Sequence, residues 1–322
     1  MLTVVLDRPH SCHNTSLKMR VHQLAGAIAS IASLASGAIT RRQSSSTQVA
    51  KLGGWVETMA VRSNGDLLLN RLDVPELWTV KASDKTASRL LSFTGAKGLT
   101  GIAEISPDVF VVVSGNFSTT SFALGSGSYV AHKVDLTGAT PTATLIKAIP
   151  EIGFGIGVAP FNNDTVFIAD AGNGALYQLT VSTGAYSVAL ADPKMKAPST
   201  AMINEGIHGL KYHNGAVYFT NTFGNTFNRV AVDSATGKVT GPVTLINDSL
   251  QGPEDFTITA NGTAYVATLT AGAVFKVTPD GKATRFADAT QCSTAAFGRG
   301  ASDKNVVYIA TSQGNVLSAP AS

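Results

Sequence analysis

The sequence predicts an all-β fold, a six-bladed β-propeller whose blades are four-stranded antiparallel sheets. Three observations predict it: one short apolar strand pattern recurs six times, each copy continues with a turn and a β-rich strand, and each copy has about the length of one blade. The first strands open at Glu57, Thr100, Phe154, His208, Glu254 and Ser293, at intervals of 39 to 54 residues. A β-sandwich would explain the strands but not their sixfold recurrence.

The parts of each copy follow in a fixed order. The first strand leads into a turn, and three of the turns contain Asn-Gly, at residues 64–65, 214–215 and 261–262. Asn-Gly between apolar runs predicts a tight hairpin in which both turn positions have positive φ. A β-rich second strand follows, such as Val306-Val-Tyr-Ile-Ala, then a third such as Ala273-Val-Phe-Lys-Val and a weaker fourth such as Val243-Thr-Leu-Ile.

The last copy lacks an outer strand of its own, because the chain ends soon after Val316-Leu317. The segment Gln48-Val-Ala-Lys-Leu, which precedes the first copy, can supply that strand and close the ring. Residues 43–322 are therefore predicted to form one propeller domain rather than two domains. A Ser/Gly/Phe-rich stretch from Asn116 to Tyr129 lengthens the second copy and is expected to overhang one face.

Residues 1–42 are predicted to be an extension that carries a secretory signal. A basic start at Arg20 leads into an apolar, Ala-rich stretch from Leu24 to Leu34 and then small residues, too short to span a bilayer. The alternative is a buried amphipathic helix, and both Met1 and Met19 can serve as the start. Within residues 43–322, four Asn-x-Ser/Thr sites agree with secretion, at residues 116, 163, 247 and 261. We expect a glycoprotein that is secreted or held in the secretory lumen, with no transmembrane segment in its mature form.

Composition narrows the class of protein. The 322 residues are 14% charged and carry a net charge of +3, without basic runs, so we expect no nucleic-acid partner. Two cysteines cannot make a disulfide scaffold, and removal of the signal would leave Cys292 as a single thiol. We expect a monomer that acts on a small molecule.

The candidate site is the mouth of the central channel, where the first residues of the innermost strands meet. The ring there comprises Glu57, Thr100, Phe154, His208, Glu254 and Ser293. A second tier comes from the ends of the second strands, at Arg71, Asn116, Asp170 and Asn221. Burying unpaired charges is costly. Two carboxylates and an imidazole in this ring therefore indicate a functional site, or else groups paired and capped within the channel.

At these residues the chain resembles the SMP-30/gluconolactonase/strictosidine-synthase-like group of six-bladed propellers. The resemblance covers roughly residues 50–318 and rests on the Glu57 opening and on five further motifs. They are Gly155-Ile-Gly-Val before Pro160, Phe167-Ile-Ala-Asp170, Gly209-Leu-Lys with Tyr218-Phe-Thr-Asn221, Pro253-Glu-Asp-Phe with Tyr265-Val-Ala, and Ser293-Thr-Ala-Ala-Phe-Gly. In lactonase members of the group, a divalent metal sits on a Glu, two Asn and an Asp. Glu57 matches the Glu, Phe154 and His208 stand where the two Asn would be, and Glu254 replaces the Asp.

This departure changes what the resemblance implies. Phe154 cannot bind a metal, so no metal or other cofactor is expected. If a divalent metal is bound, Glu57, His208 and Glu254 would hold it as a transition-metal site, unlike the oxygen-rich calcium site of the relatives. The chain shows no Gly-x-Ser-x-Gly elbow and no readable Ser-His-Asp arrangement.

The chain also looks similar to fungal hetero-Diels–Alderases of this group in size, signal and altered metal ring. That similarity implies a metal-independent cyclase of secondary metabolism that joins a quinone-methide-type heterodiene to an apolar alkene. The partner is then a small apolar or phenolic substrate. His208 or a protonated Glu254 would donate to the heterodiene oxygen, and Glu57 would act as base.

The remaining site residues are expected to bind substrate. Phe154, Phe117 and Phe122 would hold the alkene, and the polar members of the ring and second tier would contact the rest of the substrate. Three alternatives remain: a metal-dependent lactonase or esterase, a non-catalytic ligand-binding propeller, and a strictosidine-synthase-like condensation.

Overall fold

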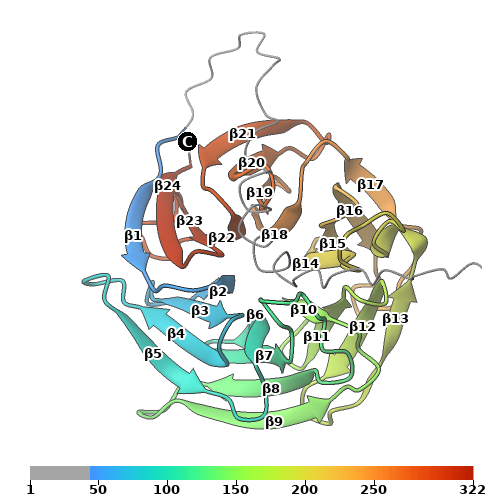
Figure 1. The fold of residues 1–322 in the computed structure, drawn as a ribbon, viewed down its shortest axis with the longest axis horizontal. Coiled ribbons are helices and arrows are strands. Elements are labelled where there is room, and N and C mark those ends of the chain that lie inside the picture. Colours follow the sequence, from blue (N-terminus) through green and yellow to red (C-terminus); the bar gives the residue numbers. More distant parts are fainter. Residues whose placement is uncertain (1–43, 322) are drawn as a thin grey trace, which may run out of the picture. The chain divides into compact units, whose positions relative to one another are not determined.

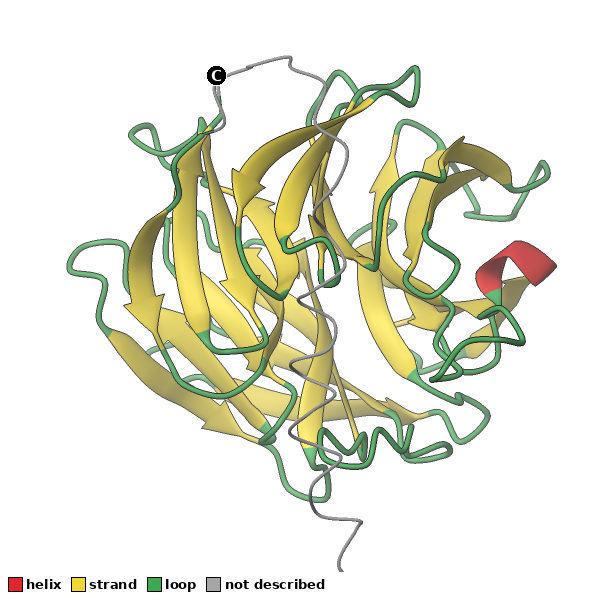
Figure 2. Ribbon diagram, turned by 45° about the horizontal axis from the view of Figure 1, so that its top comes forward, coloured by secondary structure: helices red, strands yellow, loops and turns green. Residues whose placement is uncertain are grey.

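The computed structural model describes residues 44–321, which form six four-stranded antiparallel sheets around a central axis (Figure 1). This confirms the predicted six-bladed propeller. The expected signal, residues 1–42, lies outside the described residues. Figure 2 shows how little of the described chain is helical: the one helix is the 3₁₀ turn η2 (Pro193–Met195). Within residues 44–321, no helix has the length and apolar character that crossing a membrane requires.

Each blade is one sheet whose strands follow one another from the axis outwards. Blade 1 contains β2 (Val56–Val61), β3 (Leu67–Arg71), β4 (Glu76–Val80) and β5 (Ala87–Ser92). Blade 2 contains β6 (Gly98–Ser106), β7 (Val109–Gly115), β8 (Val130–Asp135) and β9 (Thr142–Ala148). Blade 3 contains β10 (Gly155–Pro160), β11 (Thr165–Asp170), β12 (Ala175–Thr180) and β13 (Tyr186–Ala191).

The second half of the ring repeats this order. Blade 4 contains β14 (Ile207–His213), β15 (Ala216–Asn221), β16 (Thr226–Ala231) and β17 (Thr244–Asn247). Blade 5 contains β18 (Pro253–Ile258), β19 (Ala264–Thr268), β20 (Ala273–Val277) and β21 (Ala283–Asp288). Blade 6 contains β22 (Cys292–Phe297), β23 (Val306–Thr311), β24 (Asn315–Pro320) and, from the other end of the domain, β1 (Thr47–Lys51).

The ring closes as the sequence predicts. β1 pairs antiparallel with β24, with Gln48 opposite Leu317 and Lys51 opposite Asn315. The sixth blade thus takes its outer strand from the beginning of the described chain. Residues more than 260 positions apart become hydrogen-bonded neighbours, which closes the ring of blades.

The core lies in the inner strands of the blades because each sheet is packed between its two neighbours. All five residues of β3 are buried, whereas the outer strand β9 is exposed along most of its length. A strand that is covered on both faces reads as a continuous apolar run instead of an alternating one. This explains runs such as Val111-Val-Val in β7, which are completely buried.

The turns follow the predicted chemistry at one of the three Asn-Gly sites. Asn214 and Gly215 both have positive φ, as the two-residue hairpin requires. At residues 64–65 and 261–262 only the Gly has positive φ, so the predicted turn type is wrong there. The Gly65 N–H donates to the Arg62 carbonyl, and the Gly262 N–H donates to the Thr259 carbonyl. These hydrogen bonds belong to three-residue loops, which need only one residue in the left-handed conformation.

Candidate active site

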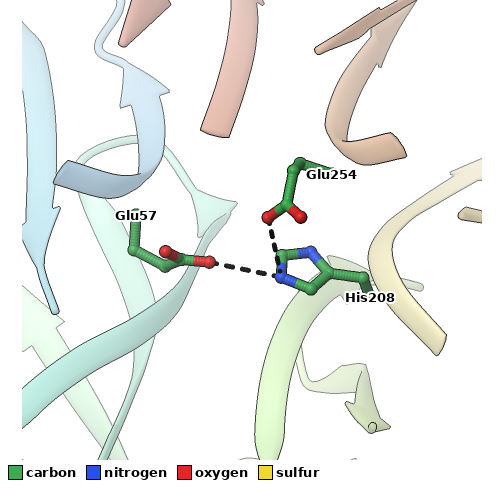
Figure 3. Close-up of side chains that lie close together, drawn as sticks. All are labelled: Glu57, His208 and Glu254. Carbon is green, nitrogen blue, oxygen red and sulfur yellow. Dashed lines mark ion pairs between the residues drawn. The ribbon is translucent and has the colours of Figure 1, made fainter. Parts of the chain in front are cut away.

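Three acid and base groups from three blades meet at the channel axis. His208 Nε2 lies 3.3 Å from Glu57 Oε1 and 3.1 Å from Glu254 Oε2, as Figure 3 shows. The three side chains are 4% exposed or less. The predicted convergence of Glu57, His208 and Glu254 is therefore present in the structure, although 197 residues separate the two carboxylates in the chain.

The strands aim these side chains through a local irregularity that recurs in the blades. Glu57, His208 and Glu254 are each the second residue of an innermost strand. In each case the pairing with the next strand shifts register across that residue, between 56 and 59, 207 and 210, and 253 and 256. A bulge of this kind re-aims one side chain, which here turns each one toward the axis.

A fourth ionisable group, Glu205, was not predicted from the sequence. Its Oε1 atom lies 3.1 Å from His208 Nε2, and its side chain is 12% exposed, the most exposed of the four. It precedes β14, in a segment that Gly206 ties to blade 3 by donating to the Ala171 carbonyl. A Cβ on Gly206 would stand 2.0 Å from the Met195 carbonyl oxygen, so only glycine permits this close crossing. Neither the strand repeat nor the spacing of the openers identifies Glu205.

Burial and charge give the cluster a high affinity for protons. Burial raises the pKa of Glu254 well above its ordinary value, and burial also raises the pKa of Glu57, against the opposing effect of His208. Burial alone would lower the pKa of His208, but the carboxylates of Glu254, Glu205 and Glu57 outweigh it and raise that pKa well above its usual 6.5. The cluster therefore holds protons that exposed carboxyl groups would release near neutral pH.

Several polar atoms of the site have no hydrogen-bond partner. Among the described residues, Glu57 Oε2, His208 Nδ1 and Trp55 Nε1 are buried and unpaired. His208 Nε2 is in the opposite situation, because three carboxylate oxygens surround a nitrogen that carries at most one proton. Buried polar groups in folded proteins are normally paired, so these atoms are free to bind a ligand.

An apolar wall lies on blades 2 and 3. The rings of Phe154 and Phe117 are stacked at 4.9 Å, with an interplanar angle of 15°. Phe122 meets Phe117 edge-on at 6.3 Å and is 44% exposed, whereas Phe154 and Phe117 are buried. Tyr129 packs against Phe154 at 5.9 Å. The structure therefore brings together the three phenylalanines that the sequence predicts to hold an apolar substrate.

Asp170 supports this wall without reaching into the acid cluster. Its Oδ1 atom accepts hydrogen bonds from the backbone N–H groups of Gly153, Phe154 and Asn173, at 3.0 to 3.1 Å. Asn221 performs a similar task in blade 4, where it accepts from Gly224 N–H and donates to two carbonyls near η2. These contacts assign both side chains a role in positioning loops, and their predicted contact with substrate stays a prediction.

The other predicted binding residues also make contacts within the protein. Ser293 Oγ lies 2.6 Å from the Val56 carbonyl oxygen, which links blade 6 to blade 1, and Thr100 Oγ1 lies 3.3 Å from the Val113 carbonyl oxygen. Arg71 forms a two-pronged ion pair with Asp73. Asn116 donates through its backbone N–H to Ser128 Oγ. Their roles in substrate binding stay predictions.

The cluster fits a divalent transition metal better than calcium. Glu57, His208 and Glu254 each offer one ligand atom, and these atoms lie within 4.8 Å of one another. Two carboxylates and an imidazole suit zinc, manganese or iron, whereas calcium prefers six or more oxygen ligands. Phe154 offers no donor at its position in the ring. If a metal is bound, these three residues would hold it.

Comparison with known proteins agrees with this architecture. A model of the family described as the SMP-30/Gluconolactonase/LRE-like region matches residues 168–313, from β11 to the turn before β24. This match agrees with the resemblance to the group that the sequence predicts. A gluconolactonase from Xanthomonas campestris has a TM-score of 0.65 at 14% identity, covering 85% of this chain and 89% of that protein. A calcium-binding regucalcin from Agrobacterium tumefaciens has a TM-score of 0.64 at 15% identity, covering 85% of this chain and 94% of that protein.

Two relatives are more similar in sequence. A proposed hetero-Diels–Alderase of Phoma sp. is 28% identical over 311 residues, which cover 84% of this chain and 86% of that protein. A second proposed hetero-Diels–Alderase, from Sarocladium schorii, is 24% identical over 215 residues, or 56% of this chain and 51% of that protein. The chain is thus similar both to lactonase-type propellers in fold and to named cycloaddition enzymes in sequence.

Proposed function

We propose that the protein is a metal-independent cyclase that forms a quinone-methide-type heterodiene and joins it to an apolar alkene in a hetero-Diels–Alder reaction. The observation that carries this proposal is that the protein holds both a buried acid–base cluster and a stacked pair of phenylalanines. Proton transfer chemistry and an apolar binding wall are both needed for such a reaction. The similarity to the two proposed hetero-Diels–Alderases supports it.

The first step is the loss of water from a substrate that carries a ring hydroxyl next to a carbinol. Glu57 Oε2, which is buried and unpaired, accepts the proton of the ring hydroxyl. Protonated Glu254 donates its proton to the carbinol oxygen, the carbon–oxygen bond breaks, and water leaves. One proton is taken and one is given, so the products are the neutral quinone methide and water, with no oxidation or reduction.

His208 returns the cluster to its starting state. After the first step Glu57 holds a proton and Glu254 has lost one, and His208 Nε2 stands 3.3 Å and 3.1 Å from the two carboxyl groups. The imidazole passes its own proton to Glu254 and takes one from Glu57. Glu205, on the more exposed side of the same nitrogen, exchanges protons with solvent.

The second step is the cycloaddition, in which one carbon–carbon bond and one carbon–oxygen bond form to the two alkene carbons. Stacked Phe154 and Phe117, with Phe122 at their edge, hold the alkene against the heterodiene. Holding two reactants in the correct relative orientation lowers the activation free energy of the cycloaddition by several kcal/mol. The N–H of protonated His208 polarises the carbonyl of the heterodiene, which strengthens its reaction with an electron-rich alkene.

The direct test supplies both reactants to the purified protein. A 2-(hydroxymethyl)phenol and a cyclic apolar alkene are incubated with the protein, with heat-denatured protein and with buffer, and the adducts are separated on a chiral column. We expect one enantiomer in excess and a rate above the buffer control. A racemic adduct at the buffer rate would contradict the proposal.

A metal-dependent lactonase is the second candidate, favoured by the fold relatives and by the three ligand atoms at the axis. A metal there would polarise a lactone carbonyl as a Lewis acid. In that case Glu57, Glu254 and His208 would serve as ligands. The purified protein would contain close to one metal per chain, and removing it would abolish lactone hydrolysis.

A further inference from the structure

The asparagines that the fold offers for glycosylation differ in how firmly the protein holds them. Residues 44–321 contain four Asn-x-Ser/Thr sequences, which begin at Asn116, Asn163, Asn247 and Asn261. N-linked glycosylation joins a bulky, water-soluble sugar to the side-chain nitrogen, so the asparagine must lie at the surface with room around its amide. Two of these four asparagines meet that requirement, and both lie on the face opposite the mouth.

The order of the strands places Asn163 and Asn261 on that far face. β10 runs from the mouth to Pro160, where it pairs with Val166 of β11, and Asn163 lies in the turn between the two strands. β18 likewise runs from the mouth to Ile258, and Asn261 lies in the turn that leads into β19. The innermost strand of a blade starts at the mouth, so its first turn lies at the other end of the channel.

Both asparagines are exposed within these turns. The residues on either side of Asn163 hold its turn, because Asn162 Oδ1 accepts from the Asp164 N–H at 2.9 Å. The side-chain oxygen of Asn261 accepts from the Thr263 N–H at 3.2 Å, a bond that leaves the amide nitrogen for the sugar. A sugar on either nitrogen can extend into solvent.

Asn116 is enclosed by the loop that it begins at the mouth. It is half-buried, and the next residue, Phe117, is buried in the stack with Phe154. A Cβ on Gly125 would stand 2.5 Å from the Asn116 carbonyl carbon, so the loop folds back closely over this asparagine. A sugar on Asn116 would have to displace the loop, and the buried Phe117 ring with it.

Asn247 ends the outer strand β17 of blade 4 and is held by blade 5. Its side-chain nitrogen donates to the Gly281 carbonyl at 2.9 Å, and its side-chain oxygen accepts from the Ser249 N–H at 2.9 Å. A Cβ on Gly281 would stand 2.3 Å from the Ile246 carbonyl oxygen, which shows how closely the two blades approach each other here. Both ends of the Asn247 amide are therefore used within the protein.

We propose that Asn163 and Asn261 carry N-linked sugars in the folded protein and that Asn116 and Asn247 do not, which keeps the mouth clear. This inference rests on the expected entry into the secretory pathway and not on the proposed reaction. The asparagine nitrogen attacks the anomeric carbon of an oligosaccharide carried on a polyprenyl diphosphate. A carbon–nitrogen bond forms, the carbon–oxygen bond to the diphosphate breaks, and the amide loses one proton as the lipid diphosphate leaves.

The test maps sugar occupancy at each asparagine. The full chain is produced in yeast, recovered from medium and cell extract, and treated with peptide N-glycosidase in heavy-oxygen water, which turns each sugar-bearing asparagine into a labelled aspartate. Peptide mass spectrometry should find the label at Asn163 and Asn261 and none at Asn116 or Asn247. A sample without the enzyme corrects for spontaneous deamidation. Label at either of the second pair, or its absence from either of the first, would overturn the proposal.

Variants of the hydroxyl residues give an independent check. Thr165→Val and Thr263→Val each keep the asparagine but remove the hydroxyl that the sequence pattern requires, so each should lose the label of its own site alone. Ser118→Ala and Ser249→Ala are the matched controls and should leave the labelling and the gel mobility unchanged. Label that persists after the threonine is replaced, or mobility that rises in either serine variant, would contradict the assignment.

Discussion

His208 Nε2 and Glu254 Oε2 lie 3.1 Å apart in the centre of the propeller, both buried. A buried ion pair or hydrogen-bonded pair of this kind adds little net stability, because desolvation of both groups offsets their attraction. The carboxylates of Glu57 and Glu205 lie near the same nitrogen, and their desolvation makes the net stabilisation of the cluster less favourable still. A cluster that costs the fold stability, and that holds protons tightly, is better explained by acid–base chemistry than by structure.

The Glu254→Gln variant tests the general acid. The amide keeps the shape of the side chain but has no transferable proton, so we expect turnover of the dehydration step to fall at least about tenfold. Product formation from a 2-(hydroxymethyl)phenol measures it, with Asp248→Asn, an exposed carboxylate, as the control. Wild-type turnover in a folded Glu254→Gln protein would exclude Glu254 as the acid.

The His208→Ala variant tests the relay. Without the imidazole, no group bridges Glu57 and Glu254, and the cluster must recover its protons through solvent. We expect a fall of about tenfold or more in steady-state turnover, with partial recovery on adding free imidazole. A single-turnover measurement should be affected less than the steady state. Equal losses in both would assign His208 to the chemical step alone.

Stability should fall as the pH rises. The pKa values of Glu254 and His208 are raised above their ordinary 4.5 and 6.5, so the folded state binds these protons more tightly than the unfolded chain. Their contribution is complete below the unfolded values and is lost as the pH rises through the folded ones. Unfolding temperatures measured from pH 5 to 9 should decline with rising pH, with Glu254 contributing to the decline from the start of this range and His208 above about pH 6.5, and the decline should be less steep in Glu254→Gln. If the unfolding temperature of Glu254→Gln declined as steeply as that of the wild type, protonation of Glu254 would not be a cause of the pH dependence.

Chelation separates the two candidate reactions. If the acid–base cluster works by protons alone, prolonged EDTA treatment should leave cycloadduct formation unchanged. Added Zn²⁺ should inhibit it, because the ion would compete with protons for His208 Nε2 and the Glu57 and Glu254 carboxylates. Metal content by mass spectrometry is the second measurement. Stoichiometric metal together with activity lost on chelation would favour the lactonase candidate.

The repeating sequence predicts the fold well because its signals are local. Apolar runs and turn residues mark each strand, and the ring closure through β1 follows from counting strands in the last copy. The turn type is predicted less well: Asn64-Gly65 and Asn261-Gly262 form longer loops than Asn214-Gly215. The same dipeptide fits both geometries, and the register of the flanking strands decides between them.

The site is only partly predictable because some of its residues lie outside the repeated strands. Glu57, His208 and Glu254 each occupy the second position of an innermost strand, so the repeat itself brings them to one axis. Glu205 lies in a connecting segment whose path depends on Gly206 crossing Met195, a tertiary contact that no local pattern encodes.

The Asp170→Ala variant tests how the apolar wall is positioned. It removes the acceptor of three backbone N–H groups, including that of Phe154, and should lower the free energy of unfolding by about 2–4 kcal/mol. Because Phe154 is then less well held, the KM for the apolar alkene should rise more than kcat falls. Asp164→Ala is the matched control, since Asp164 binds Ser182 at the opposite end of β11. Urea unfolding and alkene saturation curves measure the two effects. If both variants raise the KM equally, the position of Phe154 does not govern alkene binding.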